Sequence, residues 1–226
     1  SLEEIARRFN PDVAKLVAGV TKVGKVRYRG ERRYIENVRK MFIALADDVR
    51  VMFIKFADRI HNLEDLAVVP EPKRERIARE ALEIYAPIAN RLGMNEIKAQ
   101  LEDLAFPYVF PEDARWVNSL VTATYEAKRR TCEHLQRETR EELGRHHIAI
   151  VGLEGRLKPR YSLYQKLLRH GRDVNQIYDI IALRVIAEDV AACYAVLGII
   201  HQRWKPLKGR IKDYIAHPKS NDYQSL

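Results

Sequence analysis

The chain has 226 residues, of which 46% are hydrophobic, and it carries a formal net charge of +9. This combination excludes a disordered chain and favours one or two globular domains. No apolar run approaches the roughly 20 residues that span a membrane, and the charged start SLEEIARRF is unlike a signal peptide, so we expect no membrane partner. Cys132 and Cys193 lack the spacing of metal or redox sites, and we expect them to be buried thiols of a cytoplasmic protein.

The positive charge is concentrated in the last third of the chain. Residues 148–226 hold 13 Lys and Arg against 7 Asp and Glu, which places +6 of the total +9 there. Such a region favours an anionic partner, either nucleic acid or a phosphate-rich small molecule, although a solvated basic face accounts for the charge equally well. The chain starts at Ser1 rather than Met and stops at Leu226 without a helix-end signal, so we expect it to be truncated.

Helical periodicity dominates the first half of the sequence. It predicts a helix over 35–45 and a second from about Val49 to Leu66, which its additional apolar residues Val51 and Ile54 suggest is buried nearly all round. The apolar positions of the first helix are Ile35, Val38, Met41, Phe42 and Leu45.

The segment VVPEPK is a break, after which ERIAREALEIYAPIANRLG predicts a helix that is kinked at Pro87 and ends at Gly93. Residues 113–145 predict a long amphipathic helix.

The period changes after this long helix. Residues 148–154 and 178–186 are short and rich in strand-forming residues, and they flank a helical stretch near 161–169. A further helix is predicted over 189–204, followed by a loop with at most one strand. Helices first and then an alternation of strand and helix predict two domains that meet near residue 110.

Four polar residues occupy one face of the helix predicted from Val49 to Leu66. Asp58, His61, Asn62 and Asp65 follow the spacing i, i+3, i+4 and i+7. A buried helix keeps such a face only if partner side chains, or a metal and its ligand, satisfy it. One Asp with one His does not make a metal site, so the spacing alone favours a structural role.

The surrounding run, NVRKMFIALADDVRVMFIKFADRIHNLEDL, resembles the downstream half of the hydrolase domain of RelA/SpoT enzymes, which make and break (p)ppGpp. The resemblance implies that Asp58 is a ligand of Mn²⁺ and that Asn62 helps to hold the guanosine nucleotide. The family's other metal ligands and its catalytic Glu-Asp pair lie upstream of this motif and are absent from the sequence. Since a lone carboxylate does not hold a divalent ion tightly, we expect this chain not to hydrolyse (p)ppGpp.

Cations surround a predicted helix start in the second half of the chain. Arg156, Lys158, Arg160 and Lys166 lie around Ser162, which can cap the helix. A helix N-terminus ringed by cations suits a polyphosphate. Simple capping and surface charge remain the alternative.

Asp179 lies within the apolar run YDIIALRVI, where a carboxylate needs a cation or a metal. Such a group can hold Mg²⁺, which keeps several waters and takes substrate phosphates as further ligands. The alternative is a buried ion pair with Arg184, although strict strand alternation puts positions 179 and 184 on opposite faces. Further on, Tyr223 among Asn221 and Gln224 suits a base-stacking pocket, but a lone loop Tyr is more often structural.

Three segments together resemble the (p)ppGpp synthetase domain of the same family: GRLKPRYSLYQKL (155–167), YDIIALRVI (178–186) and GRIKDYIAHPKSNDYQSL (209–226). The resemblance implies a nucleotidyltransferase-like mixed sheet and transfer of pyrophosphate from ATP to the 3′-OH of GDP or GTP. It implies catalytic roles for Asp179, Lys166 and Arg156, with Asp179 holding Mg²⁺. It assigns ATP to Arg156, Lys158, Ser162, Lys166 and Arg184. It assigns the guanine nucleotide to Lys212, Asn221, Tyr223 and Gln224.

We therefore expect an α + α/β fold. The HD-type hydrolase part with its connecting helices would occupy residues 1–110, and the first part of the synthetase domain residues 111–226. Pro159 and Asp222 depart from the family pattern, which often has His and Gly there, and the family's catalytic Glu lies beyond Leu226. The basic form of the loop, R-x-K-D at 210–213, accompanies bifunctional members. The resemblance also implies the ribosome as a partner, through a C-terminal region that this sequence lacks.

Two other functions fit parts of the same pattern. A nucleotide-binding module without chemistry would keep the phosphate-binding residues but transfer nothing. An RNA-binding domain would explain the basic charge alone, and it predicts steep salt dependence with indifference to free nucleotide.

Overall fold

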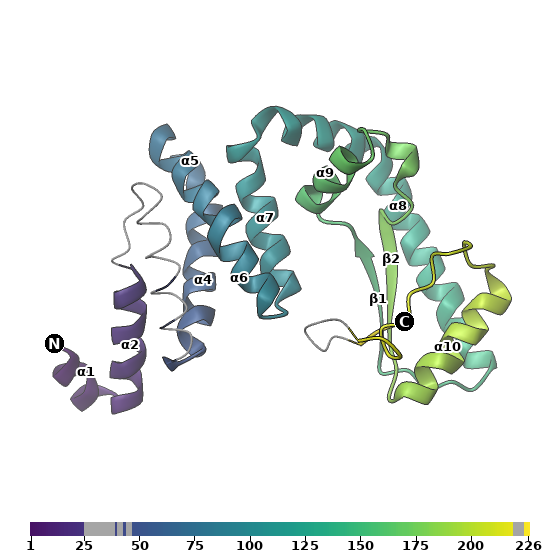
Figure 1. Cartoon of the computed structure of the whole chain (residues 1–226), viewed down its shortest axis with the longest axis horizontal. Coiled ribbons are helices and arrows are strands. Elements are labelled where there is room, and N and C mark those ends of the chain that lie inside the picture. Colours follow the sequence, from purple (N-terminus) through teal and green to yellow (C-terminus); the bar gives the residue numbers. More distant parts are fainter. Residues whose placement is uncertain (25–38, 40–42, 44–46, 219–223) are drawn as a thin grey trace. The chain divides into compact units, whose positions relative to one another are not determined.

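The computed structural model describes residues 1–24, 39, 43, 47–218 and 224–226, without the side chains of 22–24 and 122–126. The chain divides into two compact units, Ser1–Val109 and Phe110–Leu226 (Figure 1). The helix predicted over 35–45 lies outside the described residues except at positions 39 and 43, so it stays a prediction.

The first unit is helical throughout its described part. Its elements are α1 (Leu2–Arg8), α2 (Pro11–Gly24), α4 (Arg50–Glu64), a 3₁₀ turn (Leu66–Val68), α5 (Glu71–Glu80), a π-helical turn (Ala81–Tyr85), α6 (Ala86–Arg91) and α7 (Asn95–Val109). Its core contains Met52, Phe56 and Leu63 of α4, each about 1% exposed. These positions repeat at helical spacing, which is why α4 packs through one stripe.

The opposite face of α4 corrects the sequence-based expectation. Phe53 and Ile54 are 49% and 43% exposed, so the prediction that this helix is buried nearly all round is wrong. The helix is amphipathic in its packing even though its exposed face carries apolar residues.

The structure accommodates Pro87 with a π-helical turn, which the sequence did not predict. Proline cannot donate to the carbonyl four residues earlier, and its ring crowds that carbonyl. A π-helical turn precedes Pro87, in which the Ala86 N–H bonds to Ala81 five residues back, and the helical run continues to Arg91. The run ends as predicted at Gly93, whose φ of +74° suits glycine.

The second unit begins with the long helix α8 (Pro111–Arg145). It continues with β1 (Gly152–Leu157), α9 (Arg160–Arg169), a 3₁₀ turn (Val174–Gln176), β2 (Ile181–Ile186) and α10 (Val190–Arg203). The three helices predicted over 113–145, 161–169 and 189–204 are confirmed. Both strands begin later than predicted. Residues Ile148 and Ile150 pack on Leu143 before the strand starts, and this packing explains their apolar character.

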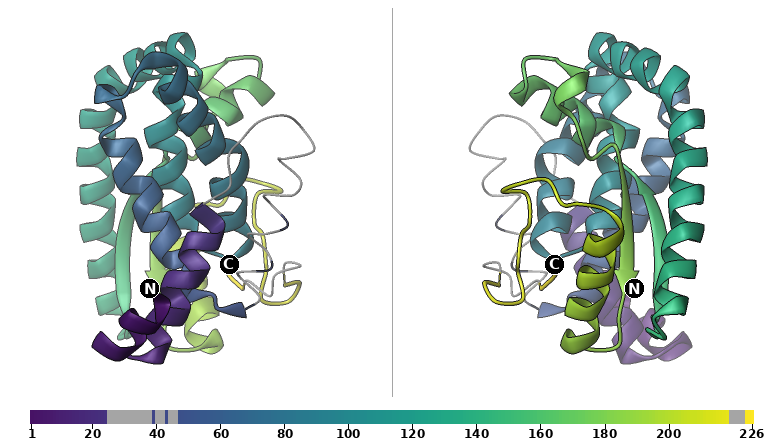
Figure 2. Two further views of the ribbon diagram at one scale, coloured as in Figure 1. Left: turned by 90° about the vertical axis from the view of Figure 1, so that its left-hand side faces the viewer. Right: turned by 90° about the vertical axis from the view of Figure 1, so that its right-hand side faces the viewer.

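The strands β1 and β2 pair antiparallel, with Gly155 opposite Leu183. Helix α8 runs along both strands (Figure 2). A Cβ added to Gly155 would lie 2.6 Å from the Cys132 Sγ of α8, so the missing side chain lets strand and helix approach closely. Cys132 is buried as expected, whereas Cys193 on α10 is only partly buried.

A helical unit followed by a unit of helices and strands confirms the α + α/β fold class. In the part of the chain that the structure describes, no helix is both long and apolar enough to cross a membrane.

Candidate functional site

The carboxylate of Asp179 holds two lysines together. Its Oδ1 accepts a hydrogen bond from Lys166 Nζ at 2.6 Å, and its Oδ2 accepts one from Lys158 Nζ at 3.0 Å. The two lysines come from segments that lie on either side of a helix start. Three residues that the sequence assigned to one phosphate site are therefore in direct contact.

Each member of this trio has a defined support. Lys158 follows β1, and its backbone N–H bonds to Ile180 O at 2.9 Å, which extends the strand pairing by one step. Lys166 lies on α9, whose buried face is made by Leu163, Tyr164 and Leu167. Asp179 precedes β2 rather than lying inside it, because the strand begins at Ile181.

The electrostatics of Asp179 reflect two opposed effects. Partial burial raises the pKa of this carboxyl, but the hydrogen bonds and charges of Lys166 and Lys158 outweigh it, so the pKa lies below its ordinary value. Because its pKa is lowered, Asp179 is ionised at neutral pH. Its side chain is 47% exposed and therefore open to solvent.

Arg184 is not the partner of Asp179, and the alternative of a buried pair between them is wrong. In the strand register Arg184 lies opposite Glu154, and its Nη1 is 4.0 Å from Glu154 Oε2. Arg156 lies opposite Ala182, two positions away, so Arg156 and Arg184 project from the same face of the strand pair. This is the face opposite to Leu153 and Gly155, which meet α8.

Ser162 does not cap α9, contrary to the sequence-based expectation. The helix begins at Arg160 after Pro159, and no side chain caps it. Ser162 lies in the first turn, four residues before Lys166, so both lie on the same side of the helix. Ser162 is partly exposed.

Sequence reasoning missed the residues that anchor α9. The Tyr164 hydroxyl donates to Asp113 Oδ2 at 2.7 Å, and Arg172 Nη2 donates to Asp113 Oδ1 at 3.0 Å. The Arg172 guanidinium also lies over the Trp116 ring, 4.9 Å from its centroid. Tyr164, the second Tyr of Y-S-x-Y-x-K, was a signal for this anchor, because it falls on the apolar side of the helix opposite Ser162.

The third motif reaches the same neighbourhood through backbone and ring contacts. Arg210 lies over the ring of Tyr178, 6.0 Å from its centroid, next to Asp179 in the chain. The Tyr214 N–H bonds to Ser225 O at 2.8 Å, which brings the exposed Gln224 beside the segment that carries Lys212. Asn221 and Tyr223 lie outside the described residues, so their roles stay predictions.

The polar face of α4 lies on the surface of the first unit. Asp58, Asn62, His61 and Asp65 are exposed, so the premise that this face is buried is wrong. Asn62 Nδ2 donates to Asp58 Oδ1 at 3.2 Å, and Lys55 Nζ lies 3.6 Å from Asp58 Oδ2. Among the described residues, no group of three or more His, Cys, Asp or Glu is arranged to hold a metal.

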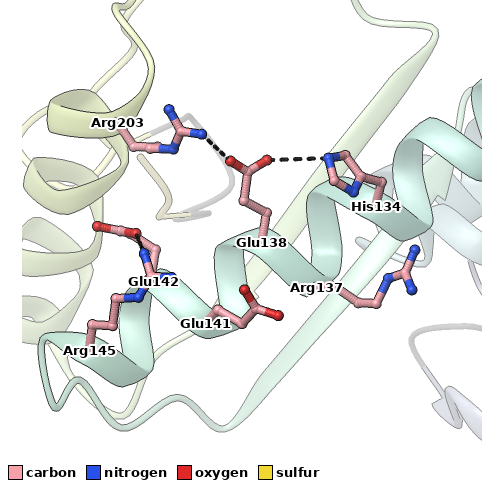
Figure 3. A pocket seen from close by; sticks show the side chains of 7 residues that line it. All are labelled: His134, Arg137, Glu138, Glu141, Glu142, Arg145 and Arg203. Atoms are coloured by element: carbon pink, nitrogen blue, oxygen red, sulfur yellow. Dashed lines mark hydrogen bonds and ion pairs between the residues drawn. The ribbon is translucent and has the colours of Figure 1, made fainter.

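A separate hollow of about 660 Å³ lies between α8 and α10 (Figure 3). Its lining combines three arginines and a histidine with three glutamates: His134, Arg137, Glu138, Glu141, Glu142, Arg145 and Arg203. Arg203 and His134 both meet Glu138, and Arg145 meets Glu142. The paired charges leave little net field for a polyphosphate, in contrast to the Asp179 trio.

Comparison with known proteins assigns both parts of the chain. An HD domain model matches residues 1–95, and a model described as a region found in RelA / SpoT proteins matches residues 155–226. A GTP pyrophosphokinase from Streptomyces coelicolor is 46% identical over 100% of this chain and 26% of its own length. The chain belongs to the RelA/SpoT family.

Other RelA/SpoT relatives are named either as a pyrophosphohydrolase or as a pyrophosphokinase. A guanosine-3′,5′-bis(diphosphate) 3′-pyrophosphohydrolase from Aquifex aeolicus is 44% identical over 99% of the chain and 32% of its own length. A GTP pyrophosphokinase rsh from Brucella abortus is 38% identical over 99% of the chain and 30% of its own length. The chain thus spans about a quarter to a third of the curated RelA/SpoT proteins it matches.

Proposed function

We propose that this chain acts in (p)ppGpp metabolism, with its second unit binding Mg²⁺-ATP and a guanine nucleotide for pyrophosphate transfer. The observation that carries the proposal is the contact of Asp179 with Lys158 and Lys166. One carboxylate and two ammonium groups meet at a partly exposed point, beside a strand face from which Arg156 and Arg184 project. The names of the relatives support the same chemistry.

The residues present fit a magnesium ion at Asp179. Mg²⁺ prefers oxygen ligands, keeps several waters and is commonly held by one or two carboxylates together with substrate phosphates. Asp179 offers such a carboxylate with a 47% exposed side chain. When bound, the ion would neutralise charge on the ATP phosphates.

The lysines have a natural second role when nucleotide enters. In the free protein Lys158 and Lys166 neutralise Asp179. Asp179 would be the residue that holds Mg²⁺ when Mg²⁺-ATP binds, and Lys158 and Lys166 would then be available to the ATP phosphates. Arg156 and Arg184 then lie where planar guanidinium groups can stack on the adenine or contact phosphate. Ser162 and Lys166 approach from the same side of α9.

The transfer itself moves a pyrophosphoryl group. The 3′-oxygen of GDP or GTP forms a bond to the β-phosphorus of ATP, and the bond from that phosphorus to the oxygen bridging the α-phosphate breaks, so AMP leaves with the electron pair. The protein's share is to align the two nucleotides and balance their charge. Lys212 and Gln224, with Asn221 and Tyr223, would hold the guanine nucleotide. The proton of the 3′-hydroxyl would pass to solvent water.

The first unit would supply part of a (p)ppGpp hydrolase. Asp58 and Asn62 would contribute to the Mn²⁺ and nucleotide sites there, but the described residues around Asp58 do not fit a manganese ion by themselves. We assign no hydrolytic step to them. The ribosome as a partner and a cytoplasmic location are parts of the same proposal.

The test measures ATP binding to this chain by calorimetry, with Mg²⁺ and with EDTA. We expect Mg²⁺ to tighten ATP binding at least tenfold. In Asp179→Asn that difference should collapse, because the variant loses the carboxylate but keeps both lysines. Lys166→Ala should weaken ATP binding under both conditions.

Matched controls use exposed charges of the same unit. Glu188→Gln and Lys205→Ala remove one charge each from outside the trio, and both should leave ATP binding within twofold. Unchanged magnesium dependence in Asp179→Asn would overturn the assignment of this carboxylate.

A non-catalytic binding module is the second candidate. It is favoured by the contacts of Asp179, whose two carboxylate oxygens each accept a hydrogen bond from a lysine that could bind phosphate without any transfer. Incubation with Mg²⁺-ATP and GDP, followed by mass spectrometry of the nucleotides, separates the two. Because the family's catalytic Glu lies beyond Leu226, the incubation uses a protein that carries this chain together with that downstream segment. Formation of AMP and ppGpp then supports transfer, whereas binding without either product supports the module. Steep salt dependence of RNA binding, with no response to ATP, would instead favour an RNA-binding domain.

A further inference from the structure

The loop that carries Lys212 is held by the side chain of Asp213. Asp213 Oδ1 accepts backbone hydrogen bonds from Ile215 at 2.9 Å and from Ala216 at 2.8 Å. The His217 N–H bonds to the Asp213 carbonyl at 3.3 Å, which closes the same turn. One residue therefore organises the turn from 213 to 217 through both its side chain and its backbone.

The same carboxylate fixes the turn to a helix. The Tyr194 hydroxyl donates to Asp213 Oδ2 at 2.9 Å, across 19 positions of sequence. Tyr194 lies on α10, which is anchored to α8 through Val196 and Ile199 at Leu143. This hydroxyl-to-carboxylate contact connects the loop to the rigid part of the second unit.

Both oxygens of Asp213 are occupied by these donors. The backbone N–H of Ala216, then the Tyr194 hydroxyl, the Ile215 N–H and the nearby His217, lower the pKa of the Asp213 carboxyl against the opposing effect of burial. The same contact with Asp213 raises the pKa of Tyr194. A carboxylate used in this way is suited to holding the turn in place.

We propose that Asp213 and Tyr194 form a latch that positions Lys212 for the guanine nucleotide. Asp213 is in this view a positioning residue that acts through Lys212. Lys212 is exposed and adjacent to the latch, and Tyr214 on the other side bonds to Ser225 beside Gln224. Fixing residue 213 therefore fixes two predicted guanine-site residues at once. The inference rests on the proposed function of the second unit.

Three variants of this chain separate the parts of the latch. Tyr194→Phe keeps the turn at Asp213 but removes its connection to α10, and the side chain is 41% exposed, so the fold should tolerate the change. Asp213→Asn keeps an oxygen that can accept from Ile215 and Ala216. Asp213→Ala removes every side-chain contact. Tyr108→Phe, in the first unit, is the matched control for loss of a tyrosine hydroxyl.

Two readouts are needed: hydrogen exchange of the Ile215 and Ala216 amides, and dissociation constants for GDP and for Mg²⁺-ATP. We expect Tyr194→Phe to weaken GDP binding about threefold to tenfold, as loss of one hydrogen bond to a charged group implies. Asp213→Ala should weaken it further and expose both amides to exchange. Asp213→Asn should restore amide protection, and Mg²⁺-ATP binding should stay within twofold throughout.

The readouts also separate the latch from the function it rests on. No GDP binding by the unmodified chain would contradict the proposed function, whatever the amides do. Unchanged GDP affinity in Tyr194→Phe would overturn the latch, since it shows that the contact does not affect GDP binding. Equal weakening of GDP and Mg²⁺-ATP binding would also overturn it, since it shows that the contact only supports the fold. Full amide protection in Asp213→Ala would overturn it as well.

Discussion

The hydroxyl of Tyr164 donates a 2.7 Å hydrogen bond to Asp113, which fixes α9 to the first turn of α8 across 51 positions of sequence. Tyr164 is 5% exposed, and its ring packs near Phe110 and Tyr161. The helix that carries Ser162 and Lys166 therefore depends on a contact that lies on its far side. Arg172 shares the same carboxylate and stabilises the arrangement.

Tyr164→Phe should lower the free energy of unfolding by about 1–2 kcal/mol, because a buried hydrogen bond to a charged group is lost while the ring is kept. Urea unfolding followed by far-UV circular dichroism measures this. Tyr178→Phe is the matched control, since that side chain is 68% exposed and should change stability by less than about 0.5 kcal/mol. Equal effects of the two variants would show that the Asp113 contact adds nothing.

The same contact predicts a loss of stability at alkaline pH. Burial, and then the hydrogen bond to Asp113, raise the pKa of Tyr164 from 10.0 to about 12. The folded state therefore keeps its proton more strongly than the unfolded state. The contribution of this raised pKa to the free energy of unfolding is complete below pH 10 and is lost as the pH rises toward 12. The difference in unfolding free energy between the unmodified chain and Tyr164→Phe should shrink across this window; a constant difference would contradict the assignment.

Gly155→Ala should destabilise the second unit by about 1–3 kcal/mol through overpacking. The new Cβ would lie 2.6 Å from Cys132 Sγ and 3.0 Å from the Gln136 side chain, in a region where α8 meets β1. Adding Cys132→Ala should recover part of the loss, which a double-mutant cycle by urea unfolding would detect. Gly198→Ala is the control, because its Cβ would meet nothing within 4 Å, and it should be neutral or stabilising.

Arg59→Ala should destabilise the first unit by about 2–3 kcal/mol. Arg59 Nη2 lies 3.3 Å from Glu80 Oε2 and donates to the Tyr85 hydroxyl at 3.0 Å, and the guanidinium lies over the Tyr85 ring. Removing it leaves the largely buried Glu80 without its cation. Thermal unfolding of Arg59→Ala beside Arg76→Ala, an exposed arginine of α5, measures the effect. Similar melting temperatures for the two variants would contradict it.

Local patterns predicted several of the helices, because periodicity records which face of a helix is buried, but the helices α1, α2 and α7 were not predicted. The long helix α8, the helix end at Gly93 and the helices α9 and α10 all follow from such patterns. The family motifs also grouped Lys158, Lys166 and Asp179, which are in contact in the structure. These three residues can be grouped from sequence because each lies at or next to an element that the sequence predicts: Lys158 after β1, Lys166 on α9 and Asp179 before β2.

Tertiary partners could not be predicted in the same way. Strand spacing did not reveal that Arg184 lies opposite Glu154, because register depends on the second strand. The helix start at Arg160 left Ser162 inside the first turn, a shift of three residues that sequence alone does not fix. The role of Asp113 as an anchor for α9 could not be predicted, since no residue near position 113 indicates a contact with a tyrosine 51 residues away.

The close approach of β1 to α8 at Gly155 gives the second unit a natural chemical reporter. Cys132 is 6% exposed behind that glycine, whereas Cys193 on α10 is partly open to solvent. A thiol reagent should therefore modify Cys193 at once, and should reach Cys132 only in moments when the strand lifts from the helix. The rate of the second, slow alkylation would report how often the strand that leads into Lys158 separates from its support.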